Sequence, residues 1–222
     1  MRILGLAILA TLAATAAQAD YTVKYEVTIT NVTRGQTFTP QLVVAHSRGV
    51  RLFKLGAPAS LSLEILAEAG DTSPLTDDLL AQSYRVSDVH TVPGLLGPGE
   101  SVTTTLEATP HHRYLSLAAM LIPTNDTFVA LNGVPLPRRA AAHMALGYDA
   151  GTEANDQNCL NIPGPRCGGE GHSSKTSDGD EGHIHISNGF HLLPAADGGE
   201  VLEPSGYDWR NPIARVAVRR LR

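Results

Sequence analysis

The sequence of 222 residues is poor in cysteine, in aromatic residues and in positive charge, and each shortage excludes a class of protein. Two cysteines are too few for a small fold held together by several disulfides. Lysine and arginine number 17 against 22 acidic residues, a net charge of −5, so the basic face that nucleic-acid binding requires is not expected. After residue 19 no apolar run reaches the ~20 residues of a membrane-spanning helix, so we expect no transmembrane segment in the mature chain.

The first 19 residues have the features of a secretory signal. Arg2 supplies the positive start, Ile3 to Ala17 form an apolar run, and Ala17-Gln18-Ala19 fits the small-x-small cleavage rule. An uncleaved anchor is the alternative, but the apolar stretch is short for one. We therefore predict cleavage after Ala19, a mature domain of residues 20–222, and export to the periplasm, the cell surface or the medium.

The cysteines, Cys159 and Cys167, lie eight positions apart in a segment rich in glycine and proline. In an oxidising compartment this pair predicts a disulfide that closes a small loop. A metal site that uses both thiolates is the alternative.

Alternating apolar and polar residues predict β-strands over most of the chain. Tyr21 to Thr30 alternate strictly, and Tyr114 to Ile122 are almost all apolar, as in a strand buried on both faces. Other predicted strands cover 41–46, 50–55, 101–108, 128–131 and 213–221, helices are predicted at 60–69 and 74–82, and a long loop at about 150–182. The fold class predicted is a mainly antiparallel β-sandwich with one or two short helices and a long loop.

Three carboxylates follow predicted strands or occupy turns. Asp126 comes soon after the apolar strand, and Asp149 and Glu153 belong to the turn Tyr-Asp-Ala-Gly-Thr-Glu. Carboxylate oxygens are the ligands that Ca²⁺ prefers, so the three could form a calcium site. Acidic residues in loops are more often simply solvated, and the spacing alone is weak support.

A family resemblance adds to this interpretation. The segment Tyr148 to Glu153 resembles the (Trp/Tyr)-Asp-Ala-Gly-Thr-(Asp/Glu) signature of the spondin N-terminal domain, and Pro-x-x-Asp-x-Phe-Val at 123–129 resembles a second stretch of that family. Phe38-Thr39-Pro40, and Tyr-Asp-Trp-Arg-Asn-Pro at 207–212, are also similar, the latter to bacterial members. The resemblance covers roughly residues 21–222.

This resemblance implies a β-sandwich that binds calcium at one end and serves as an adhesion module outside the cell. The family's calcium ligands correspond to Asp126, Asp149 and Glu153. Thr127 replaces the usual aromatic residue, Glu153 replaces a shorter aspartate, and no thrombospondin-type repeat follows. The partners of animal relatives therefore do not carry over, and the partner is expected to be an unidentified protein or glycan surface.

A second group is made of histidines. His183 and His185 would point to the same face of a strand and could share Zn²⁺ or Cu²⁺, with Asp178, Asp180 and Glu181 as neighbouring candidate ligands. Four of the nine histidines fall within twenty residues: His172, His183, His185 and His191. The alternative function is therefore a periplasmic transition-metal-binding protein. A strand fixes only two imidazoles, half of a tetrahedral zinc site, and we expect at most weak binding there.

Catalytic motifs are scarce. The sequence has no Gly-x-Ser-x-Gly turn, phosphate-binding loop or EF-hand, and His111-His112 has no nucleophile beside it. We expect a protein that binds rather than an enzyme.

Overall fold

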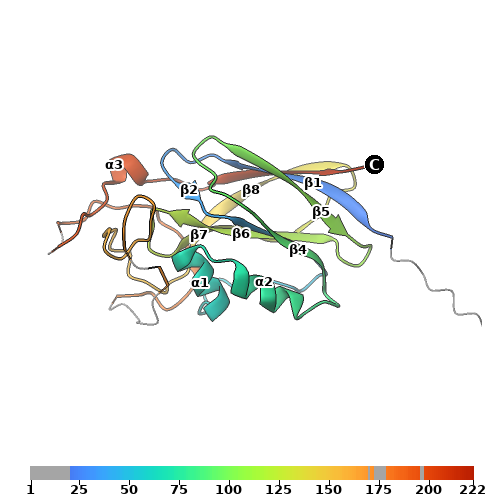
Figure 1. Cartoon of the computed structure of the whole chain (residues 1–222), viewed down its shortest axis with the longest axis horizontal. Coiled ribbons are helices and arrows are strands. Elements are labelled where there is room, and N and C mark those ends of the chain that lie inside the picture. Colours follow the sequence, from blue (N-terminus) through green and yellow to red (C-terminus); the bar gives the residue numbers. More distant parts are fainter. Residues whose placement is uncertain (1–20, 170, 173–178, 196–197) are drawn as a thin grey trace, which may run out of the picture.

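The computed structural model describes residues 21–169, 171–172, 179–195 and 198–222, so the predicted signal segment and Asp178 lie outside the described residues. The fold is mainly antiparallel β, as predicted (Figure 1). The described strands are β1 (Val23–Asn31), β2 (Thr37–Phe38), β3 (Gln41–His46), β4 (Val86–Val92), β5 (Ser101–Ala108), β6 (Tyr114–Ile122), β7 (Thr127–Pro135), β8 (Ala140–Asp149), β9 (His185–Ile186) and β10 (Ala214–Arg220).

The strands form a sheet that nearly closes on itself. Their order is β4-β3-β6-β7-β8-β10-β1-β5, with β2 beside β6 and β9 beside β8. At the two outer strands, the Ser87 hydroxyl on β4 donates to the Glu107 carbonyl on β5 at 2.9 Å, and the Glu107 amide donates to Asp88 at 2.8 Å. These side-chain bonds join β4 to β5 where the backbone ladder stops.

The core has two parts, one on each face of β6. Leu117, Ala119 and Leu121 face the interior of the sheet, together with Val27 and Ile29 of the alternating strand β1. Ala118 faces the other way, into a second cluster under the helices, as do buried residues of β3 and β7. The continuous apolar run at 114–122 is therefore explained by burial on both faces, as the sequence predicted.

Two helices lie along one face of the sheet (Figure 1), and their buried residues form part of the second core cluster. Helix α1 (Leu61–Ala69) begins after Ser60, whose hydroxyl accepts from the Leu63 amide, and ends at Gly70 in the left-handed conformation. Helix α2 (Ser73–Leu80) follows directly, and the short α3 (Pro204–Tyr207) lies near the end of the chain. None of the described helices is long and apolar enough to cross a membrane.

Residues 50–55 are not a strand, so that prediction is wrong. Val50, Leu52 and Phe53 are buried in the second core cluster, which accounts for the apolar pattern. Their backbone is satisfied by a side chain rather than by a neighbouring strand: Asn132 accepts from the Leu52 amide and donates to the Phe53 carbonyl, both at 2.9 Å. The sequence prediction also lacked β2, β4, β8 and α3, and it made β7 too short. The strand predicted for the histidines at 183–185 is only β9, His185–Ile186, and His183 lies outside it.

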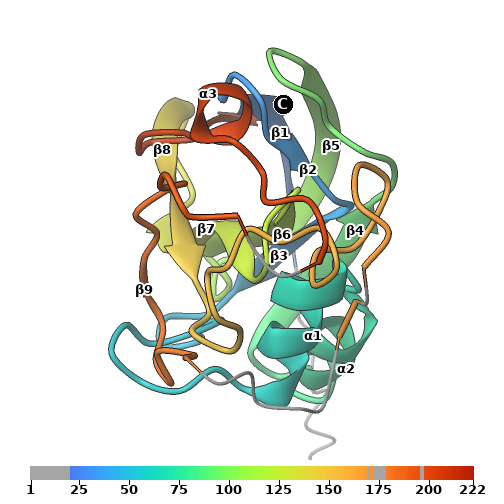
Figure 2. The same ribbon diagram turned by 90° about the vertical axis from the view of Figure 1, so that its left-hand side faces the viewer.

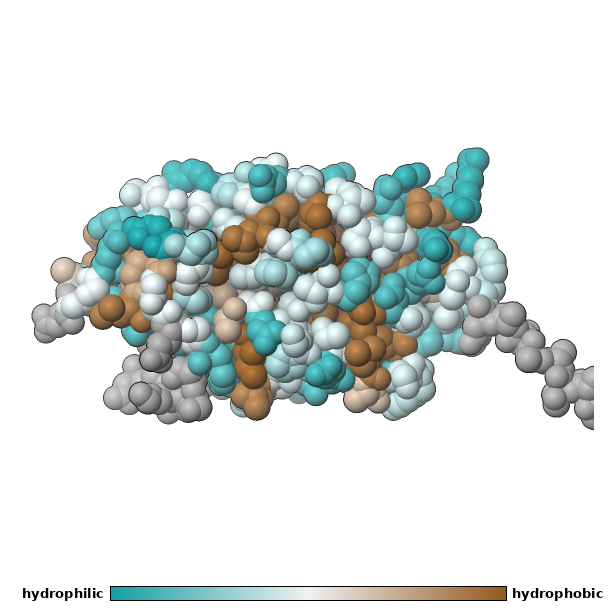
Figure 3. All heavy atoms as spheres, viewed as in Figure 1, coloured by the Kyte–Doolittle hydropathy of each residue, from teal (hydrophilic) through white to brown (hydrophobic). Residues whose placement is uncertain are grey.

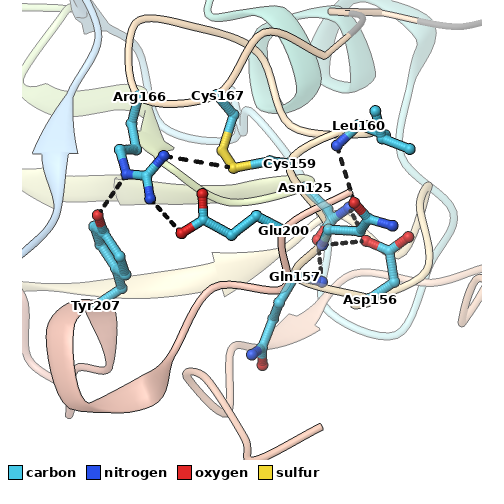
Figure 4. Close-up of a disulfide and its surroundings, with 10 residues drawn as sticks. Asn125, Asp156, Gln157, Cys159, Leu160, Arg166, Cys167, Glu200 and Tyr207 are labelled. Atoms are coloured by element: carbon cyan, nitrogen blue, oxygen red, sulfur yellow. Dashed lines mark hydrogen bonds and ion pairs between the residues drawn. A yellow bond between two sulfur atoms is a disulfide. The ribbon is translucent and has the colours of Figure 1, made fainter. Parts of the chain in front are cut away.

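The predicted disulfide between Cys159 and Cys167 is present in the long loop (Figure 4). Beside it, the Arg166 guanidinium donates to the Tyr207 hydroxyl at 2.8 Å. Hydrogen bonds also join the loop to the β6–β7 turn. The side-chain amide of Asn125 donates to Asp156 at 3.0 Å, and the side-chain oxygen of Asn125 accepts from the Gln157 backbone amide (Figure 4). The long loop is therefore fixed next to Asp126.

On the face seen in Figure 3, apolar residues form separate groups divided by polar ones. Small apolar groups of this kind are normal on the surface of a folded protein. This face does not identify a partner. The candidate metal-binding residues lie at the end of the sheet that faces the viewer in Figure 2.

Candidate metal centre at the loop end of the sheet

Strand pairing brings the candidate residues together at one end of the sheet. Thr127, at the start of β7, pairs with Asp149, at the end of β8, and Asp149 pairs in turn with His185 on β9. Asp126 directly precedes Thr127, so it reaches the same place. Residues directly opposite on antiparallel strands have side chains on the same face, so Asp149 and His185 are neighbours. Figure 2 looks onto this end, with β8 and β9 side by side.

Asp126 is fully buried in the β6–β7 turn. Its Oδ2 accepts hydrogen bonds from the backbone amides of Thr152 and Glu153, at 2.8 and 3.1 Å. Its Oδ1 is buried and has no hydrogen-bond partner among the residues that the structure describes. Burial, and then the nearby charge of Asp149, raise the pKa of Asp126 well above its usual range, and the two amide bonds oppose this effect only in part.

Asp149 is also buried, with 1% of its surface exposed. Its Oδ1 accepts from the Gly151 amide and its Oδ2 from the Asn155 side chain, both at 2.9 Å. Burial raises the pKa of Asp149, whereas the bond from Asn155 and the neighbouring His185 lower it. Two buried carboxylates whose charges oppose each other form a natural site for a cation.

Gly151 allows the loop to return beside these aspartates. Its φ is +66°, which disfavours any residue with a side chain, and a Cβ atom there would lie 2.8 Å from the His183 backbone nitrogen. The Gly182 amide donates to the Gly151 carbonyl at 2.9 Å. This close approach holds the segment 181–185 against the aspartate turn.

Glu181 and His185 complete a group with Asp149, in which each residue offers a ligand atom within 4.8 Å of the others. His185 Nε2 lies 3.5 Å from Asp149 Oδ1 and 4.0 Å from Glu181 Oε1. The Asn155 amide connects the carboxylates, since it also donates to Glu181 at 3.0 Å. The sequence identified Glu181 as a candidate ligand beside the histidines, but not its grouping with Asp149.

Glu153 is half-buried and lies between this group and a second one. Its pKa is raised to about 8, first by burial and then by the charges of Glu68, Asp126, Asp156 and Glu64 in that order. Its backbone amide bonds to Asp126, but its carboxylate is not part of the group formed with Asp149.

The second group joins helix α1 to the long loop. Glu64 and Glu68, one turn apart on α1, face His172, whose Nδ1 lies 3.6 and 3.0 Å from their carboxylates. Glu68 is 1% exposed. The spacing of four residues on a predicted helix was the available signal, and the sequence interpretation missed it because His172 lies about a hundred residues away.

The four histidines do not converge on one site. His172 lies with Glu64 and Glu68, and His185 with Asp149 and Glu181. His183 is exposed, its Nδ1 at 2.8 Å from the Glu181 carbonyl oxygen, and its ring centre lies 5.6 Å from that of His185. His191 is exposed and its backbone bonds to Gln157. Neither His183 nor His191 belongs to a metal-binding group among the described residues.

Comparison with known protein families identifies this chain's family. The family model described as Spondin_N matches residues 17–156, more than half of the chain, and this range contains Asp126, Asp149 and Glu153. No individual curated protein matches the chain.

Proposed function

The chain belongs to the spondin N-terminal domain family, and from this we propose that it is an exported, non-enzymatic binding module whose loop end is held together by Ca²⁺. Asp126 and Asp149 would hold the ion, and Glu153 would supply a third carboxylate. Calcium takes six to eight oxygen ligands, so backbone carbonyls and water would complete its shell. In this role the ion ties the β6–β7 turn to the turn after β8.

One observation carries the proposal: within the described part of the chain, Asp126 Oδ1 is a buried acceptor without a hydrogen-bond partner, next to a second buried carboxylate. A buried carboxylate oxygen without a partner costs free energy. A bound cation would supply the missing partner and would offset the repulsion between Asp126 and Asp149. The nearby carboxylate of Glu181 adds to the attraction for a cation.

Calcium binding can be measured directly by titration calorimetry on metal-free protein. We expect one Ca²⁺ per chain in the wild type and none in Asp126→Asn. Asp77→Asn is the matched control, because Asp77 is an exposed residue of α2 and the change in charge is the same. Equal calcium binding by both variants would refute the assignment of Asp126.

The binding role is proposed for two reasons. The first is membership of the family, and the second is a basic surface at the end of the sheet opposite the candidate metal site. A hollow of about 720 Å³ there is lined mainly by arginines, including Arg138, Arg139 and Arg219. Arg219 makes a bidentate ion pair with Glu26, but no ion pair to a carboxylate is found for Arg138 or Arg139 within the described residues. Arginines without acidic partners favour an anionic protein or glycan.

Charge reversal tests this part of the proposal. Arg138→Glu with Arg139→Glu should weaken retention on an immobilised sulfated polysaccharide. Arg48→Glu with Lys54→Glu changes the net charge equally at exposed positions elsewhere and should weaken retention less. Equal losses would mean that the arginine hollow has no special role.

A further inference from the structure

The imidazole of His185 is oriented as a metal ligand. Its Nδ1 lies 3.0 Å from the Ile186 carbonyl oxygen, so in the neutral ring Nδ1 carries the proton and donates it there. The lone pair of Nε2 then faces the carboxylates of Asp149 and Glu181. Histidines that bind metals show this pattern, with one ring nitrogen fixed by a carbonyl and the other on the ion.

The distances leave room for an ion. Nε2 is buried and makes no hydrogen bond within the described part of the chain, although it lies 3.5 Å from Asp149 Oδ1 and 4.0 Å from Glu181 Oε1. In a tetrahedral site with bonds of about 2.0 Å, neighbouring ligand atoms are separated by roughly 3.3 Å. The two separations from Nε2 are close to that spacing, and all three ligand atoms lie within 4.8 Å of one another, so modest movements would bring them onto one ion.

A separate observation points to a cation at the same place. Asp126 is fully buried, and its Oδ1 has no partner among the described residues. Asp126 directly precedes Thr127, which pairs with Asp149, so this oxygen lies at the same end of the sheet as the group. The end of the sheet thus offers two unpartnered buried ligand atoms, one oxygen and one nitrogen, beside two further carboxylates.

We infer that Asp149, Glu181 and His185, with Asp126 beside them, form a binding site for a first-row transition ion such as Zn²⁺. An imidazole nitrogen among carboxylates suits zinc or manganese better than calcium, which prefers oxygen. The inference deepens the proposed function because both sites use Asp149, and the two ions are therefore expected to compete. Zinc binding does not require bound calcium.

Zinc titration of the metal-free, full mature chain tests the inference, with bound metal counted after dialysis. We expect one Zn²⁺ per chain, and at least tenfold weaker binding in Glu181→Gln and in His185→Asn. His183→Asn is the matched control, since His183 is an exposed neighbour outside the group, and its affinity should stay within twofold of the wild type. Glu153→Gln should also bind zinc normally. Calcium at a hundredfold excess over its own dissociation constant should weaken apparent zinc binding about a hundredfold.

The outcomes separate the two proposals. If wild type binds no zinc, or if His185→Asn binds it as tightly as wild type, the transition-ion site is wrong, whatever calcium does. If zinc and calcium bind together without competition, the shared use of Asp149 is wrong. If zinc binds through His185 but calcium neither binds nor raises the melting temperature, the transition-ion site stands and the proposed calcium function falls.

Discussion

Replacing Gly151 by alanine should destabilise the protein by about 3 kcal/mol, because the residue meets two separate demands. A residue with a side chain at φ +66° costs about 1 kcal/mol or more. The added Cβ would also lie within 2.8 Å of the His183 backbone, so the segment 181–185 must move. That movement breaks the bond from Gly182 to Gly151, worth about 1 kcal/mol, and disturbs the buried Ile184 at a similar cost.

Differential scanning calorimetry can measure this loss. In a domain of this size, 1 kcal/mol corresponds to about 2–4 °C, so Gly151→Ala should melt about 6–12 °C below the wild type. Gly182→Ala is the matched control: its φ is +68°, but nothing lies within 4 Å of the added carbon. It should lose only about 1 kcal/mol, or roughly 2–4 °C. Equal losses in the two variants would refute the argument that the close approach to His183 positions the loop.

Three further predictions concern stability away from the metal centre. Replacing Cys159 and Cys167 by alanine opens a loop of nine residues and should cost about 2–3 kcal/mol in urea unfolding; an unchanged midpoint would show that the bond constrains nothing. Burial lowers the pKa of His46 below 6.5, so the unfolded chain takes up the proton first and stability should fall as the pH drops below about 6.5, by at most ~1.4 kcal/mol per pH unit. His46→Gln should remove that part of the pH dependence, and a variant with the wild-type pH profile would contradict it. Phe128 is fully buried against Phe53, so Phe128→Ala should lower the free energy of unfolding by about 3–5 kcal/mol. A loss below about 1 kcal/mol would contradict the packing described.

Strands with a clear alternation could be predicted from the sequence, and β8 could not. In β1 and β10 apolar and polar residues alternate because only one face is buried. Strand β8 opens with three alanines, which favour helices and give no alternation, and it is a strand because β7 and β10 lie on either side of it.

The error at residues 50–55 has a different physical cause. The segment is apolar because it is buried, not because it is a strand. Its backbone groups bond to the Asn132 side chain instead of to a neighbouring strand. Asn132 is some eighty residues further along, so no local window of sequence contains this information.

Part of the metal centre could likewise be predicted. Asp126 and Asp149 meet because each lies at the same end of adjacent strands, and the resemblance to the family identified both. Glu181 and His185 join them only because the long loop returns beside Gly151 and pairs with β8. Sequence spacing does not show such a return, and it grouped His185 with the other histidines instead.

The stability of metal-free protein with and without calcium tests the central claim most directly. A ligand that binds only the folded state adds about 2.7 kcal/mol at a hundredfold excess over its dissociation constant, or roughly 5–11 °C for a domain of this size. We expect calcium to raise the melting temperature of the wild type and of Asp77→Asn by this amount. Asp149→Asn should show no response. A wild-type melting temperature that is indifferent to calcium, in protein shown to be metal-free at the outset, would contradict the proposed site.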